Sequence, residues 1–588
     1  METLSKQLFP AGGENLVKWS GPVCFPNTRV EILDEIRVKM DDAEGKFIVW
    51  LNGMAGSGKS TIARTIAQGY AGQNRLAAMF SFSRDEADRS HAAKFIPSIA
   101  LQLAGLSSAF HAHICEVLAE NPNLPRSDIK EQWSKLFLEP LSTLEADFPQ
   151  LPLYLVVDAL DACDDLSHIY GILQLFAEAK PLETKLRILV TSRPETTVRV
   201  AFRNMPGTLY QNVALNKIPQ ATVESDISTF FEHKIEEIRS VSESLSPDWP
   251  GEEKISLLVS RALGSFIYAE TVCRFIRERA KDGLQDDALQ YILSTTIKQD
   301  DLARNTTAIR KATTPEVDLL YNEILEDICK AIGPTEDDQQ PASIFKKVAG
   351  TTITLFEPLS AIAMAGLLDI AEDNVNEQLQ HLQSFLEVPE SEEAPVRLLH
   401  SSFRDFLLDN KRCSNQQVWI DQKGAHETIA RDSMRLMSSQ LQHISNLHLR
   451  GMQANEATLE IIGGDFPPEL QYACRYWVKH LRQSDICLVE NDQIHVFLQQ
   501  FSFYWIEALG LMSRASESIL AISLLESIVA VSASEKDFDI RLTFHLDERS
   551  STFGCDYRKC KILRAEESSD IRGALSNMLP CPCFLAGN

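Results

Sequence analysis

Short apolar runs alternate with amphipathic stretches through the first 220 residues of the chain. Such runs favour strands that are buried on both faces, and the stretches between them have the spacing of helices. Strands that alternate with helices predict a parallel sheet covered on both faces, in which ligands bind at the carboxyl ends of the strands. The predicted strands are Phe47–Leu51, Ala77–Phe82, Leu151–Val157, Leu186–Val190 and Leu209–Leu215.

Helical patterns lie before the first strand and after the last one. Thr28–Met40 predicts a helix that packs with Val30, Leu33, Ile36 and Met40 on one face. Beyond about residue 222 the chain is predicted to be helical, with a long helix over Ile255–Ile276 and another over Pro315–Ile332. The proline suits the start of a helix, because its missing N–H has no partner to lose there.

The pattern changes again between Pro358 and Asp409. Two predicted helices, Ser360–Leu368 and Asp373–Leu386, precede two extended pieces joined by the acidic turn Pro389–Pro395. A further helix begins at His400. Two helices and a small β-wing indicate a winged-helix domain, and its acidic character favours a role in protein packing over DNA binding.

Residues 425–530 are predicted to be helical again. Aromatic stripes at Tyr472–Trp477 and Phe501–Trp505 indicate core positions rather than a ligand site. The chain from about Ser532 has no predicted fold. The predicted division is a lead-in (1–22), an α/β nucleotide-binding domain (23–220), a helical domain (221–345), a winged helix (346–412), a C-terminal helical domain (413–531) and a tail (532–588).

The composition excludes several classes of protein. A net charge of −25 argues against binding to nucleic acid or to an anionic membrane. The start lacks the basic and apolar regions of a signal peptide, and no run reaches the roughly 18 apolar residues of a membrane span. Twelve scattered cysteines favour a reducing compartment, so we predict a cytoplasmic protein. The cluster Cys555, Cys560, Cys581 and Cys583 has poor spacing for zinc.

The segment after the first strand carries the most specific motif of the chain. It reads GMAGSGKS and matches the phosphate-loop pattern G-x-x-x-x-G-K-[ST], with a helical pattern following. Backbone N–H groups of such a loop form an anion nest, and the helix adds the positive end of its dipole. Lys59 is expected to reach the β- and γ-phosphates, and Ser60 to hold Mg²⁺. The predicted nucleotide-binding residues are Gly53, Gly56, Ser57, Gly58, Lys59, Ser60 and Thr61.

Charged residues follow two other predicted strands at their carboxyl ends. Asp158 closes the third strand and Asp161 comes three residues later, which is a Walker B pattern. Asp158 is expected to complete the Mg²⁺ shell through water, because Mg²⁺ takes few protein ligands. Arg193 follows the fourth strand and is positioned to report a γ-phosphate. A capping aspartate and a surface arginine before Pro194 are the alternatives.

The phosphate loop, the VVDALDAC stretch and LVTSRPE together resemble the NACHT class of STAND signal-transduction ATPases, in the fungal, nephrocystin-like form. CFPNTRVEIL, FEPLS, LLHSSFRDFLLD and YACRYWVKHL also resemble that group. The resemblance covers roughly residues 24–525. It implies a switch that is closed with ADP and open and oligomeric with ATP, acting in non-self recognition and cell death with an unknown effector or sensor protein.

The same resemblance implies roles for two residues, and the sequence departs from the family pattern at a third. Arg193 matches the sensor arginine, and His400 matches the winged-helix histidine that touches the ADP phosphate. His400 capping its own helix is the alternative. The family pattern D-A-L-D-E-C has its glutamate replaced by Ala162, so hydrolysis is expected to be slow at most, with Asp161 as the possible substitute.

Three readings therefore stay open at this point. The chain is a nucleotide switch, an ordinary P-loop ATPase, or an interaction protein that holds nucleotide as a structural ligand. A GTPase is disfavoured, because no N-K-x-D motif follows the fourth strand. No repeat of 20 to 50 residues is visible, although relatives of the implied family commonly carry such an array.

Overall fold

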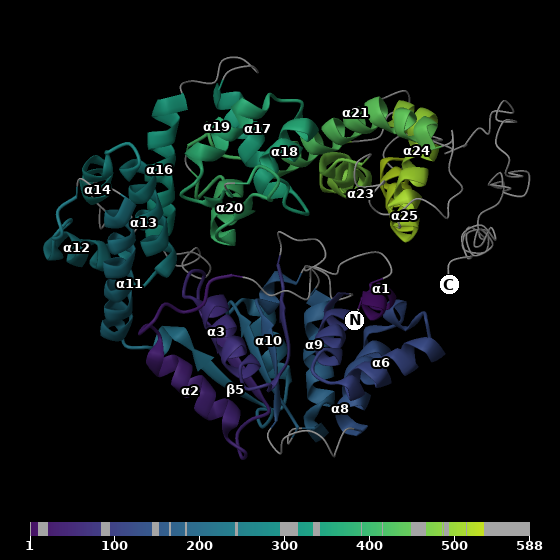
Figure 1. Ribbon diagram of the computed structural model, residues 1–588, viewed down its shortest axis with the longest axis horizontal. Helices are drawn as coiled ribbons and strands as arrows, with labels where there is room; N and C mark the ends of the chain where they lie inside the picture. Colours follow the sequence, from purple (N-terminus) through teal and green to yellow (C-terminus); the bar gives the residue numbers. More distant parts are fainter. Residues whose placement is uncertain are drawn as a thin grey trace, which may run out of the picture. The chain divides into compact units, whose positions relative to one another are not determined.

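A computed structural model describes most of the chain, in two compact units. The first unit falls within Met1–Ala361 and Glu372–Asp421, and the second within Ile362–Ala371 and Gln422–Asn588. Figure 1 labels many of their helices. The described residues are 2–9, 21–83, 94–143, 152–163, 166–182, 185–241, 245–294, 315–332, 341–389, 391–413, 415–448, 466–484, 486, 493–512 and 514–533.

The first unit contains a five-stranded sheet in the order β2-β3-β4-β1-β5, and every neighbouring pair is parallel. The predicted parallel α/β sheet is confirmed, with each strand within two residues of its expected ends. Because all the strands run the same way, their carboxyl ends share one edge. The strands are β1 (Ile48–Asn52), β2 (Leu76–Ser81), β3 (Leu153–Asp158), β4 (Leu186–Ser192) and β5 (Tyr210–Ala214).

Both faces of the sheet are buried. In β1, Val49 and Leu51 join one hydrophobic cluster, and Ile48 and Trp50 join the other. The first cluster lies under α2 (Val30–Asp41) and α3 (Lys59–Ala71). The second lies under helices on the opposite face, which are α1 (Glu2–Leu8), α5 (Phe95–Ala104), α6 (Ser108–Glu120), α7 (Ile129–Trp133), α9 (Leu166–Glu178) and α10 (Thr196–Asn204).

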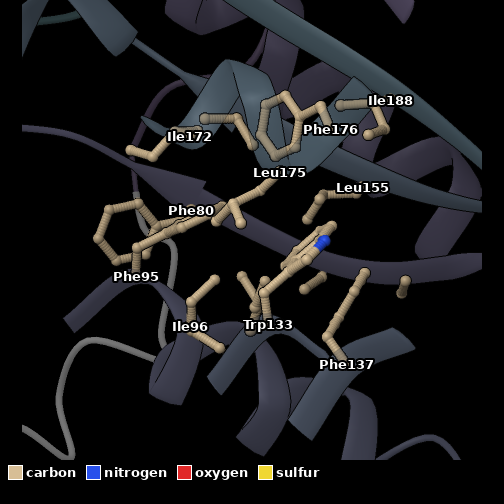
Figure 2. Close-up of a cluster of buried hydrophobic side chains, with 14 of the residues drawn as sticks. Phe80, Phe95, Ile96, Trp133, Phe137, Leu155, Ile172, Leu175, Phe176 and Ile188 are labelled. Atoms are coloured by element: carbon tan, nitrogen blue, oxygen red, sulfur yellow. The ribbon is translucent and has the colours of Figure 1, made fainter. Parts of the chain in front are cut away.

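Aromatic rings fill the second cluster (Figure 2). Trp133 stacks on Phe137 with 4.6 Å between ring centroids, and Phe80 meets Phe95 edge to face at 5.3 Å.

On the other face of the sheet, one detail of the prediction for α2 is wrong. Val30 is 52% exposed and Ile32 is buried, because the helical spacing puts Val30 to the side of the face that Ile32, Leu33, Ile36 and Met40 form.

Among the residues that the structure describes, five helices lie between the sheet and residue 340 of the first unit. The predicted single helix over Ile255–Ile276 is wrong, because the chain breaks at Leu263 and Gly264, which have φ angles of 45° and 87°. Ser265 then caps a new helix, with its side chain accepting the backbone N–H of Tyr268. The five helices are α11 (Gln220–Val241), α12 (Glu252–Ala262), α13 (Phe266–Ala280), α14 (Gln285–Ser294) and α16 (Pro315–Ile332).

The last part of the first unit contains a small antiparallel pair, β6 (Leu386–Glu387) and β7 (Arg397–Leu398). The helices α17 (Pro341–Thr354) and α19 (Glu372–His381) precede the pair, and α20 (Ser401–Leu408) follows it. The element order is that of the predicted winged helix, which stays an interpretation because α18 (Ala361–Leu368) lies almost wholly in the second unit.

Contacts with α16 anchor α20 within the first unit. The Tyr321 hydroxyl lies 2.8 Å from Ser402 Oγ, and the Tyr321 ring meets Phe403 edge to face at 5.3 Å. Arg412, just beyond α20, donates to both carboxylate oxygens of Asp318, at 2.6 and 2.9 Å. These bonds fix the position of α20 relative to α16.

The second unit is helical. The aromatic stripes lie largely in its core, as predicted: Trp477 and Trp505 meet edge to face at 5.4 Å, and Trp505 Nε1 donates to the Cys474 carbonyl. Phe503 is an exception at 45% exposure. Besides α18, the helices are α21 (Gln422–His448), α23 (Pro468–Gln483), α24 (Gln493–Leu511) and α25 (Ala515–Ala533).

Short turns complete the list of elements: η3 (Leu124–Arg126), η4 (Ser134–Leu138), α8 (Glu139–Thr143), η5 (Leu160–Ala162), η6 (Lys180–Leu182) and η7 (Leu215–Lys217). Across the ranges that the structure describes, no helix combines the length and apolar character needed to cross a membrane. The four cysteines weighed for zinc, most of the lead-in and residues 534–588 of the tail lie outside the described residues. The six-part division of the chain stays a prediction.

Candidate nucleotide-binding site

The phosphate loop connects β1 to α3, as its sequence predicts. Gly56 and Gly58 have φ angles of 76° and 85°, in the left-handed region that glycine adopts without strain. A Cβ atom at Gly53 would lie 2.6 Å from Ser57 Oγ, and one at Gly56 would lie 2.7 Å from Ile267 Cδ1. The backbone therefore requires glycine at two of its tightest points, and Gly58 is the N-cap residue of α3.

Side chains fix the conformation of this loop. Ser57 Oγ and Lys59 Nζ both donate to the carbonyl oxygen of Met54, at 2.9 and 2.7 Å. Arg29, at the start of α2, donates from Nη2 to the carbonyl oxygen of Ser57 at 3.0 Å. Arg29 is buried and its guanidinium lies over the Phe266 ring. The loop is thus held by hydrogen bonds to its own Met54 carbonyl and by the bond from Arg29, and its backbone turns at the glycines.

Lys59 is a partly buried cation at the amino end of α3. Burial lowers the pKa of Lys59 from 10.5 to about 8, against the opposing effect of the Asp161 carboxylate. Arg193 lowers the pKa further, and Asp158 opposes that shift. A phosphate would favour the charged form of this desolvated ammonium group.

Asp158 ends β3 and is fully buried. Its Oδ2 accepts a hydrogen bond from Ser81 Oγ at 2.8 Å, and its Oδ1 accepts one from Thr191 Oγ1 at 2.6 Å. Ser81 ends β2, and Thr191 lies one residue before the end of β4. Two neighbouring strands therefore orient this carboxylate at the carboxyl edge of the sheet.

Asp161 and Arg193 form a pair beside Asp158. Asp161 Oδ1 accepts the backbone N–H of Arg193 at 2.8 Å, and its Oδ2 lies 3.5 Å from Arg193 Nε. The guanidinium also donates to Asp405 Oδ2 at 3.1 Å and to Ser401 Oγ at 3.2 Å, both on α20. Burial lowers the pKa of Arg193, but the carboxylates of Asp405 and Asp161 outweigh this effect and raise the pKa above its ordinary value.

His400 is the N-cap residue of α20, where its Nδ1 accepts the backbone N–H of Ser402 at 3.0 Å. Burial, aided by the cations of Arg193 and Lys59, lowers the pKa of His400 from 6.5 to about 3. The imidazole is therefore neutral near pH 7. The hydrogen bond to Ser402 uses the Nδ1 side of the ring, as the capping alternative predicts.

The fold brings the predicted site residues of the loop, β3, β4 and α20 to one region of the first unit. Ala162 departs from them, because it packs against the hydrophobic cluster of Figure 2. Sequence reasoning missed Ser81 and Thr191, which the rule that parallel strands share a carboxyl edge could have indicated. It also missed Ser401 and Asp405, for which the segment LLHSSFRDFLLD gave no contact partner.

The oxygen donors at this edge suit a hard cation. Among the residues that the structure describes, no group of three or more His, Cys, Asp and Glu side chains is arranged to hold a metal. Mg²⁺ needs no such group, because it keeps several waters and takes one or two protein oxygens along with phosphate oxygens. The hydroxyl of Ser60 and the carboxylate of Asp158 are ligands of that kind.

Comparison with known proteins supports the resemblance drawn from the motifs. Residues 28–193 match the family described as nephrocystin 3, N-terminal. The chain is also 22% identical over 520 residues to the vegetative incompatibility protein HET-E-1 of Podospora anserina. The chain resembles the fungal NACHT group. The match covers 83% of this chain and 35% of HET-E-1, so the chain spans about a third of the length of that curated relative.

Solved structures are similar only at a low level. A STAND protein with a tetratricopeptide repeat sensor from Pyrococcus horikoshii is 13% identical, with a TM-score of 0.36, covering 89% of this chain and 70% of that chain. A Walker-type ATPase of Pyrococcus abyssi is 12% identical, with a TM-score of 0.30, covering 66% and 99%. TM-scores this low carry no argument about this NACHT-like chain.

Proposed function

We propose that this chain is a nucleotide-dependent signalling switch that binds ATP and ADP with Mg²⁺ and signals by opening and self-assembly. The observation that carries the proposal is the position of His400 and Arg193. One precedes α20 and the other follows β4, yet Arg193 donates to Asp405 and Ser401 on α20 and lowers the pKa of Lys59, and Lys59 in turn lowers the pKa of His400. A nucleotide bound at the loop would therefore meet residues from two distant segments of the first unit.

The phosphate loop is proposed to hold the phosphates with its backbone N–H groups, from Gly53 to Thr61. The positive φ angles of Gly56 and Gly58 support this, because such turns form an anion nest at the amino end of α3. Lys59 would exchange its bond to the Met54 carbonyl for phosphate oxygens. Ser60 and Asp158 would hold Mg²⁺, which neutralises phosphate charge when bound.

His400 is proposed to contact ADP in the closed state. Because Nδ1 accepts the Ser402 N–H, a neutral ring carries its proton on Nε2 and offers it as a donor. A hydrogen bond from Nε2 to a phosphate oxygen would tie α20 to the nucleotide. The same ring can thus cap α20 and bind ADP, so the two readings of His400 are compatible.

Hydrolysis is proposed to be slow at most. Arg193 occupies both oxygens of Asp161, and Ala162 contributes a methyl group to a hydrophobic cluster where relatives of the implied family carry a glutamate. Neither residue supplies a free carboxylate to orient water. The ordinary ATPase is therefore the weaker reading. The protein that keeps nucleotide only for structure is disfavoured by the ties between α20 and Arg193.

The biological role is proposed from the relatives. The name of the Podospora anserina protein connects it with vegetative incompatibility, which supports non-self recognition and cell-death signalling as the context. The proposed partners are nucleotide, further copies of this chain and an effector or sensor protein, in the cytoplasm and without nucleic acid. The net charge of −25 supports the last point.

Binding of nucleotide is tested first. Nucleotide released from the purified protein by denaturation is identified by chromatography, and affinities are measured with fluorescent ADP and ATP analogues. We expect bound ADP in the wild type, and none in Lys59→Ala because the phosphates lose their direct cation. Lys135→Ala, which removes an exposed lysine paired with Glu139, is the matched control and should bind as the wild type does. Equal binding by Lys59→Ala would remove the proposal.

A further inference from the structure

The Arg193 guanidinium contacts two carboxylates that come from different segments of the first unit. Asp161 lies in η5, just after β3, and Asp405 lies on α20, and their carboxylate oxygens are 3.5 Å and 3.1 Å from the guanidinium. Ser401 at the start of α20 accepts a further bond from Nη2. The side chain of Arg193 is 17% exposed and that of Asp405 is 29% exposed, so water screens this pair less than a surface pair.

We propose that Asp405 is a specificity-determining residue, which makes the first unit prefer a nucleoside diphosphate to a triphosphate by holding Arg193. This inference rests on the proposed function, because it requires phosphates at the loop and Arg193 as the group that meets the third one. Asp405 acts through Arg193 and needs no contact with the nucleotide. It is a positioning residue in that sense.

Competition for one cation gives the discrimination. With a diphosphate bound, Arg193 keeps its bonds to α20. A third phosphate adds negative charge close to Arg193. This charge competes with the Asp405 carboxylate for the guanidinium, and it also repels that carboxylate because both are anions. The triphosphate complex must therefore either break the ion pair with Asp405 or forgo Arg193. In both cases the Asp405 carboxylate lowers the affinity for the triphosphate relative to the affinity for the diphosphate.

Loss of the ion pair between Arg193 and Asp405 also affects how α20 is held. Asp405, Ser401 and His400 lie on or cap the same helix, so loss of the Arg193 bonds weakens the hold of the nucleotide-binding domain on α20. A ligand shifts a two-state balance only by its differential affinity for the two states. Asp405 supplies such a difference between diphosphate and triphosphate. A simple structural ion pair would instead affect both nucleotides equally.

The test is the ratio of the ADP and ATP dissociation constants in Asp405→Asn. Asparagine keeps the size of the side chain and removes its charge, so we expect ATP affinity to rise relative to ADP affinity by about tenfold or more. Asp409→Asn is the matched control, since it removes the same charge at the end of α20 and Asp409 has no bond to Arg193. Its ratio should equal that of the wild type. Asp405→Ala repeats the measurement if the first variant does not fold.

A double variant separates discrimination from structure. In an Arg193→Gln background, Asp405→Asn should leave the ratio unchanged, because the competing cation is gone. An unchanged ratio in Asp405→Asn alone, with both nucleotides still bound, would overturn the role of Asp405 and leave the nucleotide switch standing. Loss of all nucleotide binding in the wild type would instead overturn the proposed function itself.

Discussion

Nδ1 of His400 accepts the backbone N–H of Ser402 at 3.0 Å, two residues further along the chain. This bond caps α20 and places the proton of the neutral imidazole on Nε2. The cap and the proposed contact with ADP therefore use opposite sides of one ring, and two substitutions can separate them.

His400→Asn should keep the cap, because asparagine is a good N-cap residue, and lose the donor to phosphate. We expect ADP to bind about tenfold more weakly or worse, with little change in the melting temperature of the nucleotide-free protein. His400→Ala should lose both the cap and the donor to phosphate. Loss of the cap should lower the stability of the folded chain by about 1 kcal/mol. Titration with fluorescent ADP and thermal unfolding measure the two effects. Wild-type ADP affinity in both variants would leave His400 with the cap alone.

The stability of the first unit should depend on pH through His400. Burial of the ring, together with the charges of Arg193 and Lys59 and against that of Asp405, lowers its pKa in the folded chain to about 3 from an ordinary 6.5. Below about pH 6.5, His400 therefore binds a proton in the unfolded chain and stays neutral in the folded chain. Stability is fully present above pH 6.5 and is lost as the pH falls toward 3, by up to about 2 kcal/mol at pH 5.

Urea unfolding of the nucleotide-free protein at pH 7.5 and pH 5 measures this loss. His400→Asn is the control, since it lacks the titrating group and shares every other one with the wild type. The wild type should lose more stability than the variant between the two pH values. Equal losses would mean that His400 is not the group responsible.

Asp158→Asn should remove the effect of Mg²⁺ on ATP binding. Asp158 is fully buried, and Ser81 and Thr191 orient both of its oxygens. Asparagine keeps the shape but is a neutral and weaker ligand for Mg²⁺. ATP affinity in the wild type should fall when EDTA removes Mg²⁺, whereas the variant should bind ATP alike with and without EDTA. A variant that still responds to Mg²⁺ as the wild type does would exclude this role.

Gly56→Ala should damage the phosphate loop. The φ angle of Gly56 is 76°, and a Cβ atom would lie 2.7 Å from Ile267 Cδ1 on α13. We expect a loss of about 1–3 kcal/mol in stability and weaker nucleotide binding. Gly69→Ala, an exposed helical position of α3 whose Cβ would meet nothing within 4 Å, should instead stabilise by about 0.5–1 kcal/mol. Equal effects on unfolding in urea would contradict the assigned loop conformation.

Local patterns in the sequence were enough for the sheet and the phosphate loop. The strands β1 to β4 are short, mostly apolar runs, and the positive φ angles of Gly56 and Gly58 favour glycine at those positions of the loop. The break between α12 and α13 was missed although Gly264 and Ser265 are a stop and a cap, because apolar spacing continues through them. The contact between Arg193 and Asp405 spans 212 residues, and no local pattern encodes such a distance in the chain.

The central claim is that the identity of the nucleotide sets the state of the chain. Light scattering of the purified protein with Mg²⁺ and either ADP or a non-hydrolysable ATP analogue measures this most directly, with Lys59→Ala as the control that cannot respond. We predict a monomer with ADP, a larger assembly with the ATP analogue, and one unchanged mass for Lys59→Ala. The same mass for the wild type with both nucleotides, at concentrations that saturate the site, would contradict the account.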